Sequence, residues 1–495
     1  FGPNAQLDVS GSFHASTADY LRFENNAVFY VDSARQSVLS SARPEAFGFL
    51  TANPADISVN GSHFSVSEDA AISLTGGDLN IVGTGEYEGF TAGEILLVGV
   101  GAKGEVSLGS PELLYTSGAD SGTVDIFGAK LVASKESGGK IVIKGGNINI
   151  NNSSIYSFNA GSIDSDSAGI DIASAFQLNI TDDSDLVCMA QGSGAGGDFN
   201  LMAEEIILND AHIYTTSKSE GDGGDIIVDC RKLKIENEAT VRVQSESEGA
   251  AGAIQIEATD SVVINGTKSG SMYSTGITAS TSYADAADAG DITISTDLLE
   301  INNGVISSSS YGVGDTGNIV IRADSSLNMK NGNIYTAADE VDGGNIDIST
   351  ENRVYLINSD ICAGVNGGPE TKGGNVYLNS GELILNNSRV VADAVEGWGG
   401  NISIFADIYL ADSFSIVDAS SELGIDGMVD INAPLKNLSG SLKPLPTEFM
   451  NAASLLKEPC EARVEEGDYG SFIIKGRDSL PMEPGALLIS PPVEL

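Results

Sequence analysis

Cysteine is scarce in this sequence and does not predict a disulfide framework. The 495 residues include four cysteines, Cys188, Cys230, Cys362 and Cys460. Cys188 and Cys362 occupy comparable places in a repeat described below, about six repeats apart, and this separation of roughly 29 Å is far beyond the reach of a disulfide. We therefore expect free thiols, with those on strands buried as small apolar side chains.

Basic residues are also few. The chain has 25 Lys and Arg against 69 Asp and Glu, which gives a formal net charge of −44. Because proteins bind nucleic acid through cations that displace counterions, this balance argues against nucleic acid as a partner. The acidity fits a soluble extracellular protein in a salty or divalent-rich setting.

Long hydrophobic runs are missing as well. No apolar stretch approaches the ~20 residues of a membrane-spanning helix, so we expect no membrane insertion. The chain as given begins at Phe1 without a signal peptide or initiator Met, which predicts a mature or trimmed product. What is present is 41% hydrophobic residues and 59 glycines, a composition typical of a core-forming β protein.

A glycine-led motif recurs along the middle of the chain. A glycine, usually a polar residue, and an apolar/any/apolar triplet follow one another eleven times, beginning at Gly139, Gly169, Gly197, Gly224, Gly252, Gly290, Gly317, Gly344, Gly374, Gly400 and Gly427. Successive motifs are 26 to 30 residues apart, except for 38 residues between Gly252 and Gly290. A period of this length predicts a solenoid, because one unit cannot bury its apolar face alone.

Two further short apolar segments follow each triplet, for example around Leu327 and Ile334. Three short alternating strands per period predict an all-β fold, a right-handed parallel β-helix with three strands and about 27 residues per coil. The flanking Ile, Val and Leu of each triplet then point inward, and eleven coils extend for about 50 Å.

Polar residues at one corner of the predicted coil form a column. Asn318, Asn345, Asn375 and Asn401 precede successive triplets, so their amides are expected to form a ladder of hydrogen bonds. Asp198 and Asp225 fill the same column one coil apart, where two like charges repel by roughly 3 to 4 kcal/mol at an effective dielectric near 20. A bound cation, protonation or outward rotation is expected to relieve them.

Several segments near the start carry a resemblance to a known family. They are residues 1–13 (FGPNAQLDVSGSF), 44–50 (PEAFGFL), 57–59 (ISV), 74–81 (LTGGDLNI), 93–95 (GEI) and 104–106 (GEV). These segments resemble the amino-terminal secretion module of filamentous haemagglutinin-like exoproteins, which are exported by two-partner secretion. The resemblance implies a secreted adhesin or extracellular structural protein of a Gram-negative-type bacterium, with an outer-membrane transporter as its partner during export.

The start of that module is missing from this chain. The family's first strand and the Asn-Pro-Asn-Gly-like turn lie upstream of the Phe-Gly-Pro-Asn found here. A β-helix that begins at Phe1 exposes the backbone groups of an uncapped coil, which are a template for pairing with another chain. Phe1, Gly2 and Pro3 are therefore candidate subunit contacts. We assign residues 1–110 to the remainder of the secretion module and 111–433 to β-helix coils.

The last segment, residues 434–495, has a different composition. It holds eight of the thirteen prolines and lacks the glycine-led period, so it is not another coil. A short helix over 447–457 and a strand over 471–475 are expected, and the segment resembles the carboxy-terminal part of shorter exoproteins of the same family. It either caps the last coil or docks onto a neighbouring subunit through Phe472, Ile473 and Ile474.

An enzyme is an alternative that the predicted fold allows, because parallel β-helices also carry polysaccharide lyases. Such sites need several carboxylates, or carboxylates and an Arg, converging across adjacent coils. The outward position of the first strand offers no Asp or Glu on two neighbouring coils, and neither Arg322 nor Arg353 is expected to have a carboxylate cluster beside it. We therefore predict a non-enzymatic protein, with a polysaccharide-binding or pectate-lyase-like protein as the alternative.

Metal and ligand candidates are few. Two acidic runs could supply oxygen ligands to calcium, Asp164 with Asp166 and a second run of Asp182, Asp183 and Asp185, although solvated loops are the simpler interpretation. His14, His63 and His212 are too far apart in the chain to predict a metal set or catalytic triad, and no other cofactor is expected. Trp398 is either a packed corner residue or a sugar platform. The long period carries about ten extra residues within 266–289, including Tyr273 and Tyr283, as a loop or a ligand contact.

These observations predict a secreted, non-enzymatic adhesin or extracellular filament or matrix subunit. Its expected partners are the export transporter, further copies of the chain joined end to end, and a cell-surface or glycan receptor.

Overall fold

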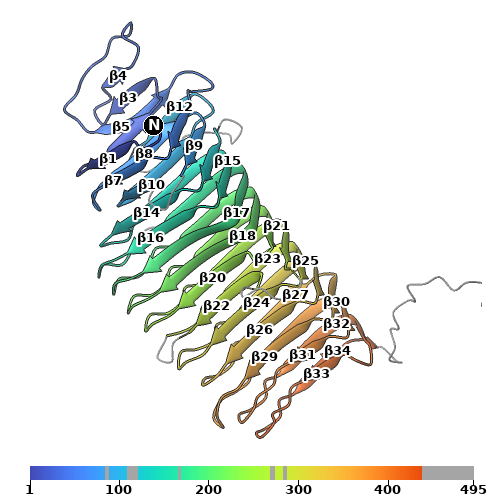
Figure 1. Cartoon of the computed structure of the whole chain (residues 1–495). Coiled ribbons are helices and arrows are strands. Elements are labelled where there is room, and N and C mark those ends of the chain that lie inside the picture. The colour runs from blue at the N-terminus through green and yellow to red at the C-terminus, as the bar shows by residue number, and fades with distance from the viewer. Residues whose placement is uncertain (84–88, 109–120, 166–168, 268–273, 283–286, 437–495) are drawn as a thin grey trace, which may run out of the picture. The chain divides into compact units, whose positions relative to one another are not determined.

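The structure is a computed structural model of the chain, and it describes residues 1–83, 89–108, 121–165, 169–267, 274–282 and 287–436. Within these residues it contains strands and no helix (Figure 1). The strands stack as parallel coils of a β-solenoid with about 28 residues per turn, so the fold prediction is confirmed. Cys460 and the predicted helix and strand after residue 436, with Phe472, Ile473 and Ile474, lie outside the described residues, as do Asp166, Tyr273 and Tyr283.

Each coil contributes to three faces, and the longer strands bend from one face to the next. Face A contains β1 (Gln6–Val9), β7 (His63–Val66), β10 (Gly89–Ala92), β14 (Lys130–Lys135), β16 (Ser154–Asn159), the last parts of β17 (Ile170–Ala190) and β18 (Phe199–Ser217), β20 (Thr240–Ser245), β22 (Gly276–Thr281), β24 (Val305–Ser310), β26 (Asn333–Ala338), β29 (Asp360–Val365), β31 (Arg389–Val391) and β33 (Ile416–Asp418).

Face B holds the glycine-led triplets. It contains β2 (Phe13–Ser16), β8 (Ala71–Gly76), β11 (Glu94–Gly99), the first parts of β15 (Lys140–Asn151), β17, β18, β19 (Ile226–Glu236), β21 (Ile254–Asn265), β23 (Ile292–Asn302), β25 (Ile319–Lys330), β30 (Val376–Asn386) and β32 (Ile402–Ala411), and also β27 (Ile346–Thr350) and β34 (Val429–Asn432).

Face C completes the coil. It contains β6 (Ile57–Asn60), β9 (Leu79–Val82), β13 (Val124–Phe127), β28 (Arg353–Ile357), β35 (Leu435–Lys436) and the later parts of the long strands.

The motif glycine is required by the spacing of the coils. A Cβ on Gly317 would lie 2.1 Å from the carbonyl oxygen of Gly290, and one on Gly344 would lie 2.1 Å from that of Gly317. Real Cβ atoms do not approach backbone that closely, so any larger residue must push neighbouring coils apart. This contact explains why the motif begins with glycine.

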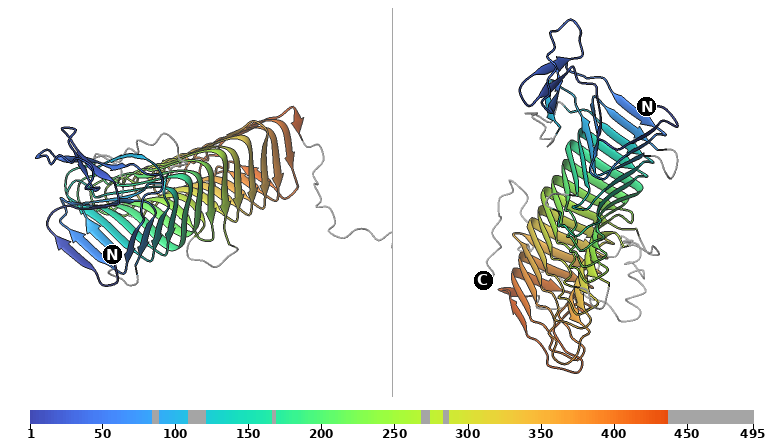
Figure 2. Two further views of the ribbon diagram at one scale, coloured as in Figure 1. Left: turned by 90° about the horizontal axis from the view of Figure 1, so that it is seen from above. Right: turned by 90° about the vertical axis from the view of Figure 1, so that its left-hand side faces the viewer.

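The inward side chains form one hydrophobic core. It runs from Ile57 in β6 to Ala433 beyond β34 and consists mainly of fully buried Ile, Val and Leu from all three faces. Figure 2 shows the coils stacked along one axis in two further views. Because inward and outward residues alternate along each strand, the predicted inward columns follow directly from the triplet pattern.

The predicted asparagine ladder is confirmed. Asn345 Nδ2 donates to Asn318 Oδ1 at 3.0 Å, and Asn375 Nδ2 donates to Asn345 Oδ1 at 2.8 Å. Asn401 continues the ladder at 3.2 Å. Each Oδ1 also accepts the backbone N–H of the residue one coil further on, as in the 3.0 Å bond from Asn345 N to Asn318 Oδ1.

The aspartates of the same column use the same backbone bond. Asp198 Oδ1 accepts the N–H of Asp225 at 2.9 Å, and Asp225 Oδ1 accepts the N–H of Ala253 at 2.7 Å. Burial raises the pKa of the Asp198 carboxyl, and the charge of Asp225 raises it further, against the lowering effect of the backbone bond. A raised pKa is the direction that burial and a nearby like charge both give a carboxyl, and the form of relief stays a prediction.

A second ladder, which the sequence analysis did not identify, lies at the corner between faces C and A. Asn303, Asn331, Asn358 and Asn387 all have φ near +50° (52°, 51°, 48° and 47°). Asparagine tolerates this left-handed conformation, and the amides bond from coil to coil at 3.1, 3.3 and 2.9 Å. The column therefore turns the chain and links the coils.

A small antiparallel sheet interrupts the early coils. It has the order β12 (Gly104–Ser107), β5 (Pro44–Phe49), β3 (Tyr20–Phe23) and β4 (Val28–Tyr30). A second buried cluster joins it to the outer side of face B and contains Phe49, Leu96, Val98, Val100, Val106 and Val142. The sequence repeat did not predict this sheet, because a repeat of this kind places every strand in a coil.

Candidate functional site

The outward column of face B is arranged as the sequence predicted. The register aligns Val142, Asp171, Asn200, Ile227, Gln255, Thr293, Val320, Asp347, Tyr377, Ser403 and Asp430. The next outward column differs, because Asp229 and Glu257 are register partners on neighbouring coils. Sequence reasoning missed this pair because it followed only one outward position per strand. Asp171 is paired with Lys144 at 3.5 Å.

The expectation for Arg353 was wrong. Arg353 lines a hollow of about 480 Å³ together with Glu351, Glu382 and Asp407, and we call this the β28–β32 hollow. Its Nη2 donates to Asn328 Oδ1 at 3.3 Å, while its Nε is buried and has no hydrogen-bond partner among the described residues.

The carboxylates of the β28–β32 hollow are not part of the outward column of face B. Glu351 and Asp407 lie at the corner after face B, and Glu382 lies on face C as the register partner of Arg353. Arg322 also has an acidic neighbour, since its Nη2 lies 3.9 Å from Asp347 Oδ2. An Arg with three carboxylates is the combination that uronate-cleaving sites use, although these carboxylates are exposed to solvent.

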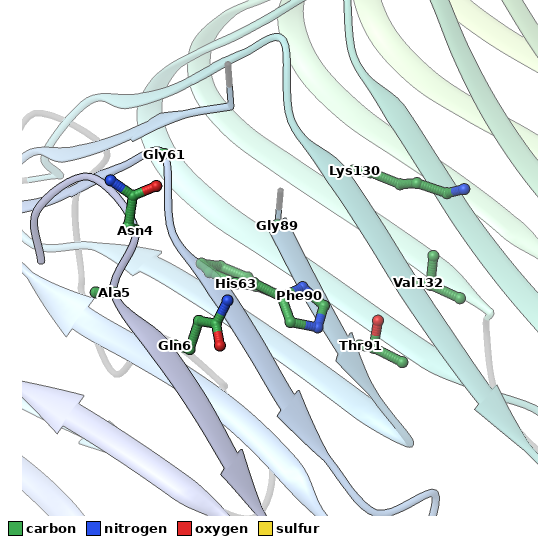
Figure 3. Close-up of a pocket in the computed structure, with 10 residues that line it drawn as sticks. All are labelled: Asn4, Ala5, Gln6, Gly61, His63, Gly89, Phe90, Thr91, Lys130 and Val132. Atoms are coloured by element: carbon green, nitrogen blue, oxygen red, sulfur yellow. The ribbon is translucent and has the colours of Figure 1, made fainter. Parts of the chain in front are cut away.

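A second hollow of about 450 Å³ lies over β7, β10 and β14 on face A (Figure 3). Gly89 stands between His63 and Lys130 in the outward column, so one side chain is missing from that row. A Cβ on Gly89 would lie 1.8 Å from the Lys130 carbonyl oxygen. We call this the β7–β14 hollow.

The two basic side chains of the β7–β14 hollow do not converge. His63 Nδ1 is buried and lacks a hydrogen-bond partner within the described ranges. Figure 3 shows the Lys130 side chain extending away from His63, and its Nζ lies 5.8 Å from the centre of the Tyr156 ring. The hollow is therefore polar, but its two basic side chains do not point toward a common ligand position.

Aromatic and apolar side chains continue along face A beyond this hollow. Tyr156, Val187 and Tyr214 form one outward column, and the Phe158 ring lies 5.9 Å from that of Tyr156. Burial raises the pKa of Tyr214 to about 12, and the charge of Asp185 adds to this effect. The Tyr214 phenol therefore remains protonated at neutral pH, and the column presents ring surface and hydroxyl groups.

The calcium candidates are separated in the structure. Asp182 and Asp183 adopt left-handed φ values of 55° and 57° at a corner, whereas Asp185 lies on face A opposite His212. Asp164 Oδ1 accepts the N–H of Ala195 at 3.0 Å. Among the described residues, no group of three or more His, Cys, Asp or Glu could hold a metal ion. Calcium binding stays a prediction.

The histidines and cysteines lie on different strands. His14 is in β2, His63 in β7 and His212 in β18, and burial lowers the pKa of His14. Cys188, Cys230 and Cys362 are free thiols, as expected. The expected burial is confirmed for Cys188 and Cys230, which belong to the core. It was wrong for Cys362, which lies in the outward phase of its strand beside Tyr335 and is only partly buried.

The amino-terminal contact candidates cover the end of the first coil. The Phe1 ring is half exposed and meets Phe64 and Phe13 edge-on, with ring centres 5.0 and 6.0 Å apart. The carbonyl oxygen of Gly2 accepts a hydrogen bond from Ser62, and Pro3 is exposed. Whether these residues contact another subunit stays a prediction.

Trp398 is half exposed at its corner, and the Lys372 ammonium lies 5.8 Å from the centre of its ring. The Trp398 ring is therefore in contact with a cation at the surface and is not packed wholly in the core. Within the described ranges, no helix is long and apolar enough to cross a membrane.

Comparisons with known proteins gave no match to a family model, to a curated protein or to a solved structure.

Proposed function

We propose that this protein is a secreted, non-enzymatic β-solenoid that acts as an adhesin or as a subunit of an extracellular filament or matrix. The observation that carries the proposal is the single core that runs from Ile57 to Ala433. Because every coil rests on that core, the outward side chains are held in fixed columns. A surface that is regular along the stack suits attachment at several points, in which separate weak contacts add to high avidity.

The resemblance to filamentous haemagglutinin-like exoproteins supports the export route. Residues 1–13 contain β1 and the first residue of β2 in the first coil, and residues 44–50 contain β5 of the antiparallel sheet. We propose that the chain leaves the cell through an outer-membrane two-partner transporter and acts at the cell surface or outside the cell.

Adhesion is tested with beads that carry the full chain, applied to surfaces coated with neutral or anionic polysaccharide and to bare glass. An unrelated acidic protein on matched beads is the control for charge. We expect retention on at least one coated surface above that control.

Filament formation is tested on the same protein by sedimentation velocity and negative-stain imaging, with and without divalent cations. End-to-end assembly predicts particles that lengthen with concentration. Strictly monomeric protein that also fails to retain beads would contradict both forms of the proposal.

A polysaccharide-cleaving enzyme is the second candidate, and the β28–β32 hollow is the observation that favours it. Incubation with polygalacturonate then releases oligosaccharides, and Glu382→Gln and Asp407→Asn each abolish the release. Asp430→Asn, which changes an outward carboxylate of face B in the last coil, is the matched control. An absence of product from the unaltered chain would reject this candidate.

A further inference from the structure

A third hollow lies on face A over β26, β29 and β31, near the other end of the stack from the β7–β14 hollow. Its volume is about 420 Å³, within the range of small-ligand sites. Tyr335, Asp360, Cys362, Gly364, Arg389 and Asp393 line it, together with uncharged polar and apolar residues. We call it the β26–β31 hollow.

Small residues in the outward positions create this space. Ala337 and Gly364 are register partners on neighbouring coils, so the row that would otherwise fill the hollow is nearly bare. A Cβ on Gly364 would lie 2.7 Å from Asp393 Oδ1. The missing side chain at Gly364 therefore leaves room for the Asp393 carboxylate beside the floor of the hollow.

One wall is aromatic and the other is polar. Tyr335 is partly buried and is the register partner of Cys362. Asp360, two residues before Cys362 on β29, is the register partner of Arg389; Arg389 Nη1 lies 3.9 Å from Asp360 Oδ2, and both side chains are about half exposed. That pair balances the only cation among the six residues. Asp393 has no ion-pair partner among the described residues, so its carboxylate leaves the hollow with negative charge.

The thiol in the hollow is not a nucleophile. Cys362 Sγ lies 3.9 Å from Asp393 Oδ1. Burial, and then the Asp393 charge, raise the pKa of Cys362 to about 11, so the group stays a thiol at neutral pH. The arrangement therefore suits binding and not covalent chemistry.

We infer that the β26–β31 hollow binds an uncharged saccharide as part of the adhesive surface. A sugar ring offers a C–H face that packs against an aromatic ring and hydroxyl groups that donate to carboxylates, and the hollow supplies Tyr335 for the first and Asp360 and Asp393 for the second. Its negative charge disfavours uronates and other anions. This inference rests on the proposed function and names the ligand class of one site on that surface.

Titration calorimetry of the full chain tests the inference. The probes are cellohexaose and mannohexaose as neutral sugars, an oligogalacturonate as the anionic sugar, and a lysine hexapeptide as the cation. We expect a neutral sugar to bind more tightly than the oligogalacturonate, because Asp393 repels the latter. A preference for the oligogalacturonate or the peptide, or no binding of either neutral sugar, would overturn the inference.

Variants assign the binding to this hollow. Tyr335→Ala removes the aromatic wall, and Asp393→Asn removes one acceptor charge with little change in volume, so each is expected to weaken neutral-sugar binding about tenfold or more. Tyr377→Ala, which truncates an exposed aromatic on face B, is the control and should bind as the unaltered chain does. Binding that survives both hollow variants contradicts the inference.

The bead assay separates this inference from the proposed function. One outcome is that the Tyr335→Ala protein binds no neutral sugar but beads that carry it still adhere. That outcome would reject the saccharide site as part of the adhesive surface and leave the proposed function standing. Beads of the unaltered chain that fail to adhere would reject adhesion as the function, whatever calorimetry shows.

Discussion

At the scale of single residues, the corner columns determine how closely the coils stack. Glycine allows one coil to approach the next, and the oxygen of an Asn or Asp side chain accepts the N–H of the coil above. The close approach depends on one glycine per coil, and the corner bond depends on one side-chain oxygen per coil. Single substitutions at these positions therefore test both contributions to stability.

Gly344→Ala is expected to destabilise the fold by about 1–3 kcal/mol, because the new methyl group would lie against the Gly317 carbonyl oxygen. Thermal unfolding followed by circular dichroism measures the effect. Gly368→Ala is the matched control, since a Cβ there has no neighbour within 4 Å. Equal melting temperatures for the two variants would contradict the role of the motif glycine.

Asp198→Asn is expected to stabilise the protein at neutral pH. The fold raises the pKa of Asp198, so its contribution is fully present below the ordinary Asp pKa of about 3.9 and is lost as pH rises through the folded value. An Asn keeps the acceptor for the Asp225 N–H without the charge. The gain should be under about 1 kcal/mol, because solvent screens this partly exposed carboxyl.

The measurement for Asp198→Asn is unfolding by urea at several pH values. The variant and the unaltered chain should agree below pH about 3.9 and separate as pH rises. A difference that grows toward low pH would have the wrong sign for this explanation.

At the scale of elements, the antiparallel sheet is the part that does not follow the repeat. Its strands pack on outward residues of β11 and β15, so Leu96, Val98 and Val142 are buried although they point away from the main core. The continuous apolar run Leu96-Leu97-Val98 indicates this burial on both faces, because a strand that is covered on both faces does not alternate apolar and polar residues.

Phe49→Ala is expected to loosen the antiparallel sheet and leave the solenoid folded. Phe49 is 2% exposed, and truncation of a buried Phe costs about 3–5 kcal/mol. Hydrogen exchange should rise in β3, β4, β5 and β12 and stay unchanged in the coils from β17 onward. Phe29→Ala, at an exposed position of β4, is the control. Faster hydrogen exchange throughout the solenoid would contradict the interpretation that the two hydrophobic clusters are separate.

At the scale of the whole described unit, the coils interact mainly with their immediate neighbours. Each coil adds three strand pairings, and corner bonds such as Asn345 to Asn318 link several of the coils, so stability should be close to a sum over coils. The hollows arise where this regularity weakens, as at Gly89 and Gly364.

Removal of one full coil should be tolerated. Deletion of residues 291–317 joins Gly290 to Asn318, and these positions repeat over the 27 residues that separate Asp291 from Asn318. We expect a folded protein with a slightly lower melting temperature, measured by circular dichroism and gel filtration. Deletion of β23 alone, residues 292–302, is the control and should aggregate, because every later strand then meets the wrong partner. Equal behaviour of both deletions would contradict coil-by-coil stacking.

The sequence by itself determined the solenoid, its three strands per coil, the inward columns and the asparagine ladder at Asn318. These features follow from the local alternation of apolar and polar residues and from the fixed period, and both can be read directly from the sequence. The left-handed asparagines, such as Asn331, also recur at that period and could have been found in the same way.

Only the tertiary structure decided that Arg353, Glu382 and Asp407 line one hollow and that Tyr335 and Asp393 border another. The antiparallel sheet over face B was likewise decided at this level. Each depends on which outward residues become neighbours across coils, and corner lengths and insertions set that register. Because those lengths vary from coil to coil, residues far apart in the chain are brought together only when the coils stack.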